Sequence, residues 1–352
     1  MEATPAPRPI ALTLAGTGPE ADRWARALRG VEGVTLDRIA PGDEEFLAGL
    51  SRGDVDGFVF VPPVADLAGA VRRAVIAGRH VFVAGAPALS SKQIMALEDL
   101  SRRRGRAIVF DGGTLGDEQV QFVRKMTSGA NPLWRPRYLR ALRTGFAGDA
   151  PLDALAIADI GRVLAIAGGP PSAVSALTPR VDDESGVADV ALLTLWFDGG
   201  PVARIDISLV EPALRHELVV GCDARTIVLR PLDREAPLLI QASGRHRGPK
   251  YAGQWAETVS EHPVDQVRDR AAAAAEIFVT AVRDDDASAT NAADVARAAL
   301  VWERARVSMS QDGEQVAVAE RVASRPAFEV IEGGGHTCAG HAAPRLTVVA
   351  RH

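Results

Sequence analysis

The sequence predicts a doubly wound parallel α/β sheet at its N-terminal end, followed by an α+β domain with a large open antiparallel sheet and helices. Three observations predict this fold class. Apolar, strand-sized runs alternate with helix-period segments between residues 10 and 110. The first of these runs ends at a glycine-rich turn. Beyond residue 137 the alternation is replaced by longer strand-like runs separated by hairpin turns.

The glycine-rich turn follows the apolar run 10–15 and precedes a segment, 20–28, with helical periodicity. A strand that turns tightly into a helix presents backbone N–H groups and the positive end of the helix dipole, which suit a phosphate. Ala21 stands at the third position of the G-x-G-x-x-G/A pattern, where a small side chain lets helix and strand pack closely. The predicted binding segment is Gly16, Thr17, Gly18, Pro19 and Glu20. A glycine-rich turn without a ligand is the alternative interpretation.

The remaining elements follow in an order typical of a Rossmann domain. Strands are predicted at 34–40, 58–61, 80–83 and 107–110, and helices at 46–51, 66–77, 90–103 and 117–126. We expect a dinucleotide-binding domain over 8–130, a substrate and oligomerisation domain over 131–320, and a tail over 321–352. The closing helices, within 264–310, are expected to pack near the first domain. Strands of the second domain are predicted at 138–142, 187–197, 202–210, 215–220 and 221–229.

The composition of the chain narrows the class of protein. Its 352 residues are 47% hydrophobic and carry a net charge of -5, which gives no reason to expect a nucleic-acid or anionic-membrane partner. Two cysteines, Cys222 and Cys338, argue against a disulfide scaffold, and Cys222 is predicted to be structural. No apolar run is long enough for a bilayer, and the N-terminus lacks the features of a signal peptide. The prediction is a soluble cytoplasmic protein.

Several segments of the first domain resemble one family. In chain order they are Gly16–Gly18, Asp54–Asp56, Val61–Pro63, Ala77–Val83 and Ala88–Ser90. Together they resemble the glucose–fructose oxidoreductase, inositol dehydrogenase and MocA (Gfo/Idh/MocA) family of NAD(P)-dependent dehydrogenases. The resemblance implies NAD or NADP as cofactor, and it adds Val61, Pro62, Pro63 and Ala84 to the expected cofactor contacts. It also implies a sugar-like substrate or ligand, and a homo-oligomer or a heteromer with a related subunit.

The sequence departs from this family where the family keeps its acid–base residues. The family lysine after the fourth parallel strand is replaced by Ala84-Gly85-Ala86. Only three lysines occur in the chain, and Lys92 is expected to be a surface charge on the next helix. The family histidine after the Pro-Pro pair is replaced by Asp66.

A helix at 155–164 resembles the family's Gly-Ile-His-Asp helix, with Ala158 at the histidine position. Asp159 stands at the matching aspartate and is the one candidate catalytic residue. The alternative is that it only complements the helix dipole.

The acidic residue that holds the adenine ribose in the family has no direct counterpart. Its position aligns near Ala40-Pro41, and Asp43 would replace it only if the loop bent back. Asp37 and Arg38 are expected to be surface residues at the edge of a strand. The choice between NAD and NADP therefore stays open at this level.

The glycine-rich tail holds His336, Cys338 and His341, whose spacing could ligate zinc with a fourth partner. A glycine-rich tail with incidental residues is the favoured interpretation, and no metal is predicted.

Three hypotheses follow for the function of the whole chain. It is a degenerate family member that binds ligands without catalysis, an active dehydrogenase or reductase with a relocated acid–base group (Asp159, Asp66 or a tail histidine), or a non-redox enzyme that reuses the cleft.

Overall fold

The structure is a computed structural model that describes most of the first 318 residues. The described ranges are 9–40, 49, 54–87, 89–112, 114–129, 134–145, 151–179, 189–223, 225–230, 238–243, 257–262 and 269–318. The chain divides into one compact unit over 1–318 and a second over 319–352, and every described element belongs to the first. No helix among these residues is both long and apolar enough to cross a membrane.

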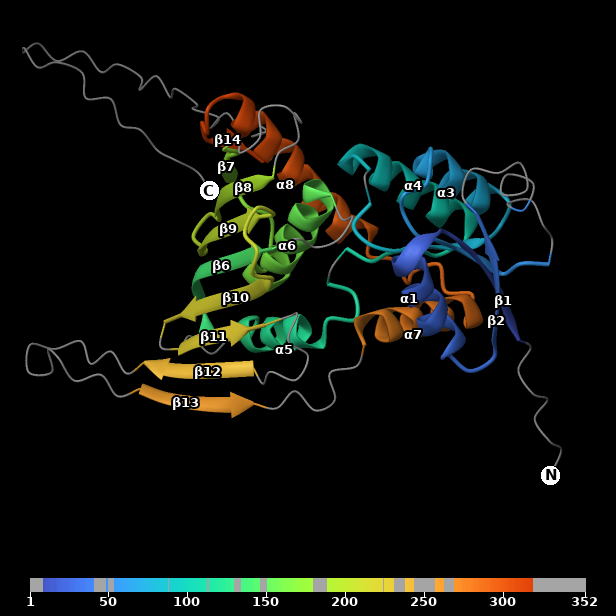
Figure 1. Cartoon of the computed structure of the whole chain (residues 1–352), viewed down its shortest axis with the longest axis horizontal. Helices are drawn as coiled ribbons and strands as arrows, with labels where there is room; N and C mark the ends of the chain where they lie inside the picture. Colours follow the sequence, from blue (N-terminus) through green and yellow to red (C-terminus); the bar gives the residue numbers. More distant parts are fainter. Residues whose placement is uncertain are drawn as a thin grey trace, which may run out of the picture. The chain divides into compact units, whose positions relative to one another are not determined.

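The first sheet has five parallel strands in the order β2-β1-β3-β4-β5 (Figure 1). The strands are β1 (Ile10–Ala15), β2 (Val34–Ile39), β3 (Gly57–Phe60), β4 (His80–Val83) and β5 (Ile108–Phe110). Because β2 and β3 lie on opposite sides of β1, the chain reverses its direction of winding there, and ligands of such sheets bind at that switch point. The predicted Rossmann-type fold is confirmed.

Helices cover both faces of this sheet. One face packs against α1 (Gly18–Arg29) and α7 (Arg270–Arg283), where the ring centroids of Trp24 and Phe82 lie 4.8 Å apart and those of Phe82 and Phe278 5.5 Å apart. The other face packs against α3 (Leu67–Ile76) and α4 (Ser91–Arg104). The strands are buried on both faces, which explains their continuous apolar runs.

The helix α4 ends where the sequence predicts because both ends carry strong local signals. Ser90 and Gln93 form a reciprocal capping box, and Gly105 adopts the left-handed conformation at the C-terminal end. The Glu303 carboxylate, from a distant helix, also accepts from the Ser91 backbone N–H at 2.6 Å and from its hydroxyl at 3.0 Å. This contact fixes α4 against α8 (Ala292–Ser310).

The helix α8 (Ala292–Ser310) runs from the edge of the first sheet to the second. At its start, the Asn291 side chain accepts from the Phe110 backbone N–H at 2.9 Å and donates to the Phe110 carbonyl at 2.6 Å. Near its end, the Ser308 hydroxyl accepts from the Ala176 backbone N–H at 2.8 Å. One helix therefore holds both sheets through hydrogen bonds to their backbones.

The second sheet has nine strands in the order β13-β12-β11-β10-β6-β9-β8-β7-β14. They are β6 (Pro136–Thr144), β7 (Ala173–Leu177), β8 (Val190–Trp196), β9 (Val202–Ser208), β10 (Arg215–Cys222), β11 (Arg225–Leu229), β12 (Leu238–Ser243), β13 (Glu257–His262) and β14 (Val316–Ala317). The prediction of an antiparallel sheet needs one correction, because β6 and β9 pair in parallel while the other neighbours pair antiparallel. The sheet is mixed.

Helices α6 (Leu152–Ala167) and α8 pack on one face of this sheet, and α5 (Glu118–Thr127) packs on α6 (Figure 1). The strand β8 shows the resulting alternation. Its residues Ala191, Leu193 and Leu195 are buried, whereas the residues between them are only partly buried. This period of two places one row of side chains against the helices and the next row on the opposite face.

Candidate nucleotide and substrate site

The turn after β1 has the geometry that close approach of a phosphate requires. The helix α1 starts at Gly18, whose φ of +80° suits glycine, and a Cβ built there would meet nothing within 4 Å. Gly16 has the opposite property, since a Cβ there would lie 2.7 Å from the Cβ of Val61 and 3.3 Å from that of Ala21. Gly16 is therefore required for packing, and Gly18 leaves the backbone open above the turn.

The N-terminus of α1, like those of α6 and α8, has no side-chain cap, whereas α3, α4, α5 and α7 have one. Aspartate or serine side chains at Asp66, Ser90, Asp117 and Asp269 accept from backbone N–H groups of α3, α4, α5 and α7. Thr17, at the same position before α1, makes no such hydrogen bond. The first N–H groups of a helix need acceptors, so this end is suited to an external anion.

The other predicted cofactor contacts lie at the same edge of the sheet. The Val61 N–H donates to the Ala15 carbonyl at 2.9 Å, and the Ala84 N–H donates to the Phe60 carbonyl at 2.8 Å. Val61 and Ala84 are buried, and the Pro62–Pro63 peptide bond is cis. The carboxyl ends of β1, β3 and β4 thus bring all the predicted segments together, as parallel strands do.

Glu20 is the exception among the predicted contacts. It lies in the first turn of α1, and its carboxylate accepts from the Trp24 indole N–H at 3.0 Å and from Arg23 at 3.4 Å. These partners hold the carboxylate along the helix. A phosphate at the turn would therefore face backbone groups rather than this side chain.

The segment after β4 carries no acid–base side chain. Ala84, Gly85 and Ala86 follow the strand, and a Cβ at Gly85 would have open space around it. Lys92 is exposed on α4, as predicted. Asp66 caps α3, where its carboxylate accepts from the Gly69 N–H at 3.1 Å and pairs with Arg73 at 3.4 Å.

The candidate catalytic residue, Asp159, is buried in an ion network. Its two carboxylate oxygens accept from the Nε and Nη2 of Arg143 at 2.7 and 2.8 Å. Oδ1 also accepts from Arg162 Nη1 at 2.8 Å. The Nε2 of His216 lies 2.9 Å from Asp159 Oδ1 and 3.1 Å from Arg143 Nη2. Asp159 is 1% exposed, so its charge serves these partners rather than solvent.

The charges of this network follow from burial and pairing. Burial alone would raise the pKa of Asp159, but its contacts with His216 and Arg143 outweigh it and hold that pKa well below its ordinary value. Burial lowers the pKa of His216 to about 4, although the neighbouring Asp159 favours its protonated form. At neutral pH the network therefore consists of ionised Asp159, cationic arginines and a neutral histidine.

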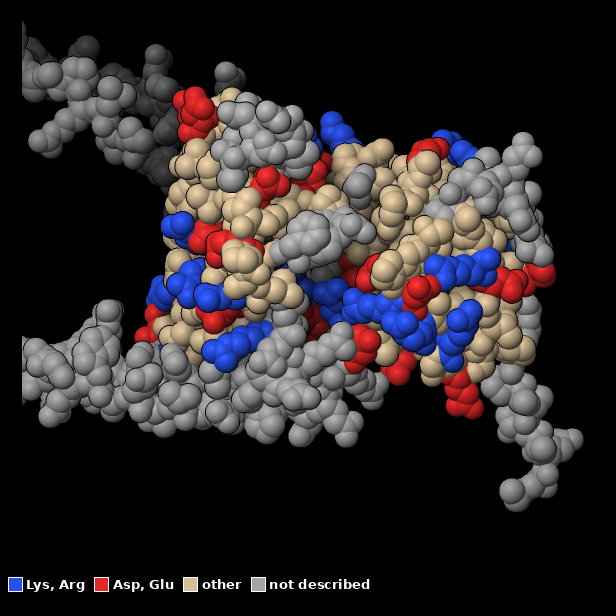
Figure 2. Space-filling model, in the orientation of Figure 1, with Lys and Arg blue, Asp and Glu red and all other residues tan. Residues whose placement is uncertain are grey.

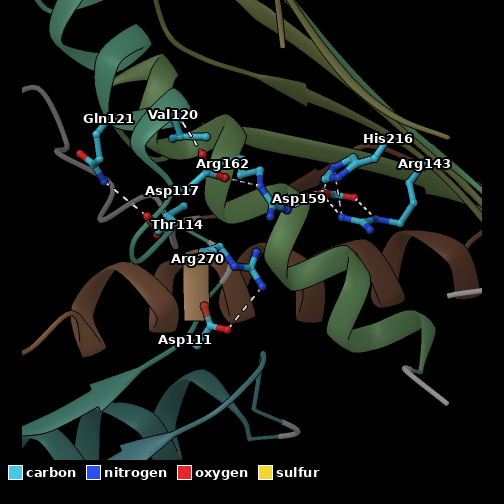
Figure 3. A network of polar contacts seen from close by, with 10 residues as sticks. All are labelled: Asp111, Thr114, Asp117, Val120, Gln121, Arg143, Asp159, Arg162, His216 and Arg270. Atoms are coloured by element: carbon cyan, nitrogen blue, oxygen red, sulfur yellow. Dashed lines mark hydrogen bonds and ion pairs between the residues drawn. The ribbon is translucent and has the colours of Figure 1, made fainter. Parts of the chain in front are cut away.

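The network continues from α6 toward the first sheet (Figure 3). Arg162 Nε lies 3.3 Å from Asp117 Oδ2, while Asp117 Oδ1 caps α5 by accepting from the Val120 N–H at 3.1 Å. At the end of β5, buried Asp111 pairs with Arg270 of α7 at 3.4 Å. Opposite charges alternate along this path, which compensates the desolvation of each buried group.

Small residues let the loop after β5 pack tightly between two helices. A Cβ at Gly112 would lie 2.6 Å from Val295 of α8, and one at Gly161 of α6 would lie 3.2 Å from the Gly112 carbonyl oxygen. A cavity of about 180 Å³ opens beside this loop, lined by residues of α5, α6 and α8.

Three residues of the site were not anticipated from the sequence. Arg143 and His216 lie on different strands of the second sheet, and nothing in their local sequence marks them as partners of Asp159. Arg38 is an exposed residue of the edge strand β2, as expected, but its contact was not anticipated: its Nε donates to the Gly16 carbonyl at 3.1 Å. Its place at the end of the second strand, beside the glycine turn, was the available signal.

Charged side chains of both signs lie over α1 and α7 on the face in Figure 2. Arg23 of α1, for example, pairs with Glu20 and with Asp269, which precedes α7. The basic side chains there alternate with carboxylates. This face therefore carries mixed charge rather than a continuous basic patch.

The cysteine and metal predictions can be assessed only in part. Cys222 is partly buried at the end of β10, and burial raises the pKa of its thiol to about 11, which disfavours a reactive thiolate. Within the described residues, no group of three or more His, Cys, Asp or Glu could hold a metal ion. The tail residues His336, Cys338 and His341 lie outside the described residues.

Solved structures with the same fold include dehydrogenases and a ketoreductase, two of them bound to nicotinamide cofactors. One is a UDP-N-acetylglucosamine 3-dehydrogenase from Acidithiobacillus ferrooxidans, with 19% identity, a TM-score of 0.67, and coverage of 86% of this chain and 98% of that one. A second is a levoglucosan dehydrogenase in complex with NADH, with 12% identity, a TM-score of 0.71, and coverage of 89% and 100%. A third is a 3-ketoreductase from Actinomadura kijaniata in complex with NADP, with 17% identity, a TM-score of 0.68, and coverage of 86% and 98%.

These proteins are oxidoreductases of the Gfo/Idh/MocA kind, so the resemblance found in the sequence is confirmed at the level of the fold. No family model matches the chain, and no curated protein matches it. At sequence identities below 20%, this similarity shows the fold alone. The activity of this chain has to be argued from its own residues.

Proposed function

We propose that this protein binds NAD(P)(H) and a sugar-like ligand but does not catalyse hydride transfer on its own. One contrast carries the proposal. The turn Gly16–Gly18 keeps an open backbone and a helix start without a side-chain cap, whereas Asp159 is enclosed by two arginines and a histidine. Nucleotide binding relies on the open turn. Proton transfer would need a carboxylate that is free to contact the substrate, and Asp159 is not.

The first strands supply what a dinucleotide needs. The phosphates would lie against the backbone of Gly16, Thr17 and Gly18, with Val61, Pro62, Pro63 and Ala84 along the same edge. When bound, the nicotinamide supplies the hydride chemistry of this class of protein. The segment directly after β4 supplies no proton acceptor, because Ala84, Gly85 and Ala86 have no titratable side chain.

The test is to titrate the purified protein with NADH and NADPH by fluorescence and then to follow hydride transfer with a panel of sugars and cyclitols. We expect binding of at least one nucleotide and no steady turnover. Turnover that disappears in Asp66→Asn, or in an Asp159→Ala variant shown to be folded, would establish the alternative, an active enzyme with a relocated acid–base residue. Asp66→Asn is the cleaner variant, because asparagine caps a helix as well as aspartate does.

Absence of binding of both nucleotides at millimolar concentration would remove the cofactor part of the proposal. Turnover that appears only when a related subunit is added would assign this chain the role of a partner subunit. A cytoplasmic location is also part of the proposal, and fractionation of cells that express the tagged protein tests it.

We further propose that the protein assembles through the helix-free face of the second sheet. Apolar residues on the outer rows of this sheet support an interface, with Tyr138 41% exposed and Val202 38% exposed on neighbouring strands β6 and β9. Light scattering should give a mass of at least two chains. A single-chain mass at micromolar concentration would contradict it.

A further inference from the structure

The arginine beside the glycine turn, Arg38, lies near the carboxyl end of β2, two residues before Ala40, and it is in this region that a Rossmann domain distinguishes its two nicotinamide cofactors. It belongs to β2, next to Leu14 of β1 in the parallel register. Its Nε donates to the Gly16 carbonyl at 3.1 Å, so the guanidinium lies against the turn. Its side chain is 35% exposed, which leaves part of it accessible to a ligand.

A second contact fixes the guanidinium in this place. The Nη1 of Arg38 lies 2.5 Å from Oδ1 of Asp22, which is on α1 and is half exposed. A guanidinium has five N–H donors, and these two contacts engage Nε and Nη1. The Nη2 donors are not part of either contact, so a bound anion can use them without displacing the anchor.

The residues that directly follow Arg38 matter because an acidic side chain there would favour NAD. Ile39 and Ala40 follow it directly and carry no carboxylate, and residues 41–48 lie outside the described residues. An acidic side chain at this place binds the free ribose hydroxyls of NAD, whereas an arginine accommodates the extra phosphate of NADP. Arginine also matches phosphate geometry with paired donors better than lysine does.

We infer that this protein prefers NADP(H) over NAD(H), with Arg38 as the specificity residue that contacts the phosphate on the adenosine ribose. The inference rests on the proposed nucleotide binding and adds the form of the nucleotide to it. Asp22 acts as a positioning residue that holds Arg38 against the turn. Its own negative charge would oppose the phosphate, so the selectivity depends on the arginine.

The experiment compares NADPH with NADH, and 2′,5′-ADP with 5′-AMP, by calorimetry on the full chain. We expect the nucleotides with the extra phosphate to bind about 10- to 100-fold tighter, as expected for one or two hydrogen bonds between charged groups. Arg38→Ala should remove most of this difference while changing NADH affinity by less than about threefold. Arg38→Lys should restore part of it, because the charge is kept without the paired donors.

Two control variants keep the test specific. Arg29→Ala removes an exposed arginine from the last turn of α1 and should change neither affinity. Asp22→Asn removes the opposing charge and should keep or increase the preference for NADPH. The far-ultraviolet spectrum and the melting temperature of each variant establish that it is folded.

NADH affinity equal to or above that of NADPH in the unmodified protein would overturn the inference, as would equal weakening of both nucleotides in Arg38→Ala. A loss of NADH binding in Asp22→Asn would assign the ribose contact to Asp22 instead. If neither nucleotide binds, the nucleotide proposal itself fails together with this inference, a result distinct from equal binding.

Discussion

The glycine turn after β1 and the ion network around Asp159 differ in whether their polar groups have partners. At the end of β1, the turn Gly16–Gly18 leaves backbone N–H groups without a side-chain cap. On α6, the carboxylate oxygens of Asp159 are fully engaged by three buried partners. The comparison teaches that a binding site built from backbone survives extensive sequence change, since it needs only small residues. A catalytic site depends instead on the identity and surroundings of single side chains.

The largest expected effect on stability comes from disrupting the buried ion network around Asp159. Asp159→Ala leaves Arg143 buried without its carboxylate and Arg162 with Asp117 alone, and we expect it to reduce the free energy of unfolding by about 3–5 kcal/mol. Urea denaturation measures this change. The matched control is Asp206→Ala, which breaks the more exposed pair with Arg204 and should reduce stability by at most about 1 kcal/mol. Equal effects of the two substitutions would show that Asp159 is not a structural centre.

The second effect concerns pH. The pKa of His216 falls from 6.5 in the unfolded chain to about 4 in the folded protein, so the folded state favours the neutral ring. Its contribution is fully present above pH 6.5 and is lost as the pH falls toward 4, by on the order of 3 kcal/mol. Asp159, Arg143 and Arg162 are the charged groups that face this ring.

The free energy of unfolding, measured by urea at several pH values, should fall more steeply in this window for the unmodified protein than for His216→Gln. The variant is the needed control because burial also lowers the pKa of His80, which contributes in the same direction. Parallel curves for the two proteins would contradict the assignment of this pH dependence to His216.

The smallest expected effect concerns the glycine turn Gly16–Gly18. Gly16→Ala places a Cβ 2.7 Å from Val61, and we expect this overpacking to reduce stability by about 1–3 kcal/mol and to weaken nucleotide binding. Gly169→Ala is the control, since a Cβ there meets nothing within 4 Å. Thermal denaturation and fluorescence titration measure the two consequences. Unchanged binding in a folded Gly16→Ala variant would show that the turn does not carry the nucleotide.

Much of the fold could be predicted from the sequence because its signals are local. The capping box of Ser90 and Gln93, the stop at Gly105 and the strand β3 follow from residues within a few positions of each other. The parallel pairing of β6 with β9 could not be predicted, because it joins strands far apart in the chain. A strand pattern gives the buried face and does not give the neighbour.

The candidate site likewise has one part that could be predicted from the sequence and one that could not. The glycine turn is a local pattern and was found in the sequence, whereas the environment of Asp159 depends on Arg143, 16 residues before it, and on His216, 57 residues after it. Ala158 shows only that a histidine is missing from α6. It does not show that a histidine from β10 lies against the neighbouring aspartate.

The contact between Asn291 and Phe110 has a consequence for association. The strand β5 is an edge of the first sheet, and an open edge offers backbone groups to which a strand of another molecule can add. The Asn291 amide accepts from and donates to the backbone of Phe110, as a neighbouring strand would. A single side chain thus occupies, at Phe110, the backbone hydrogen bonds that a foreign strand would use there.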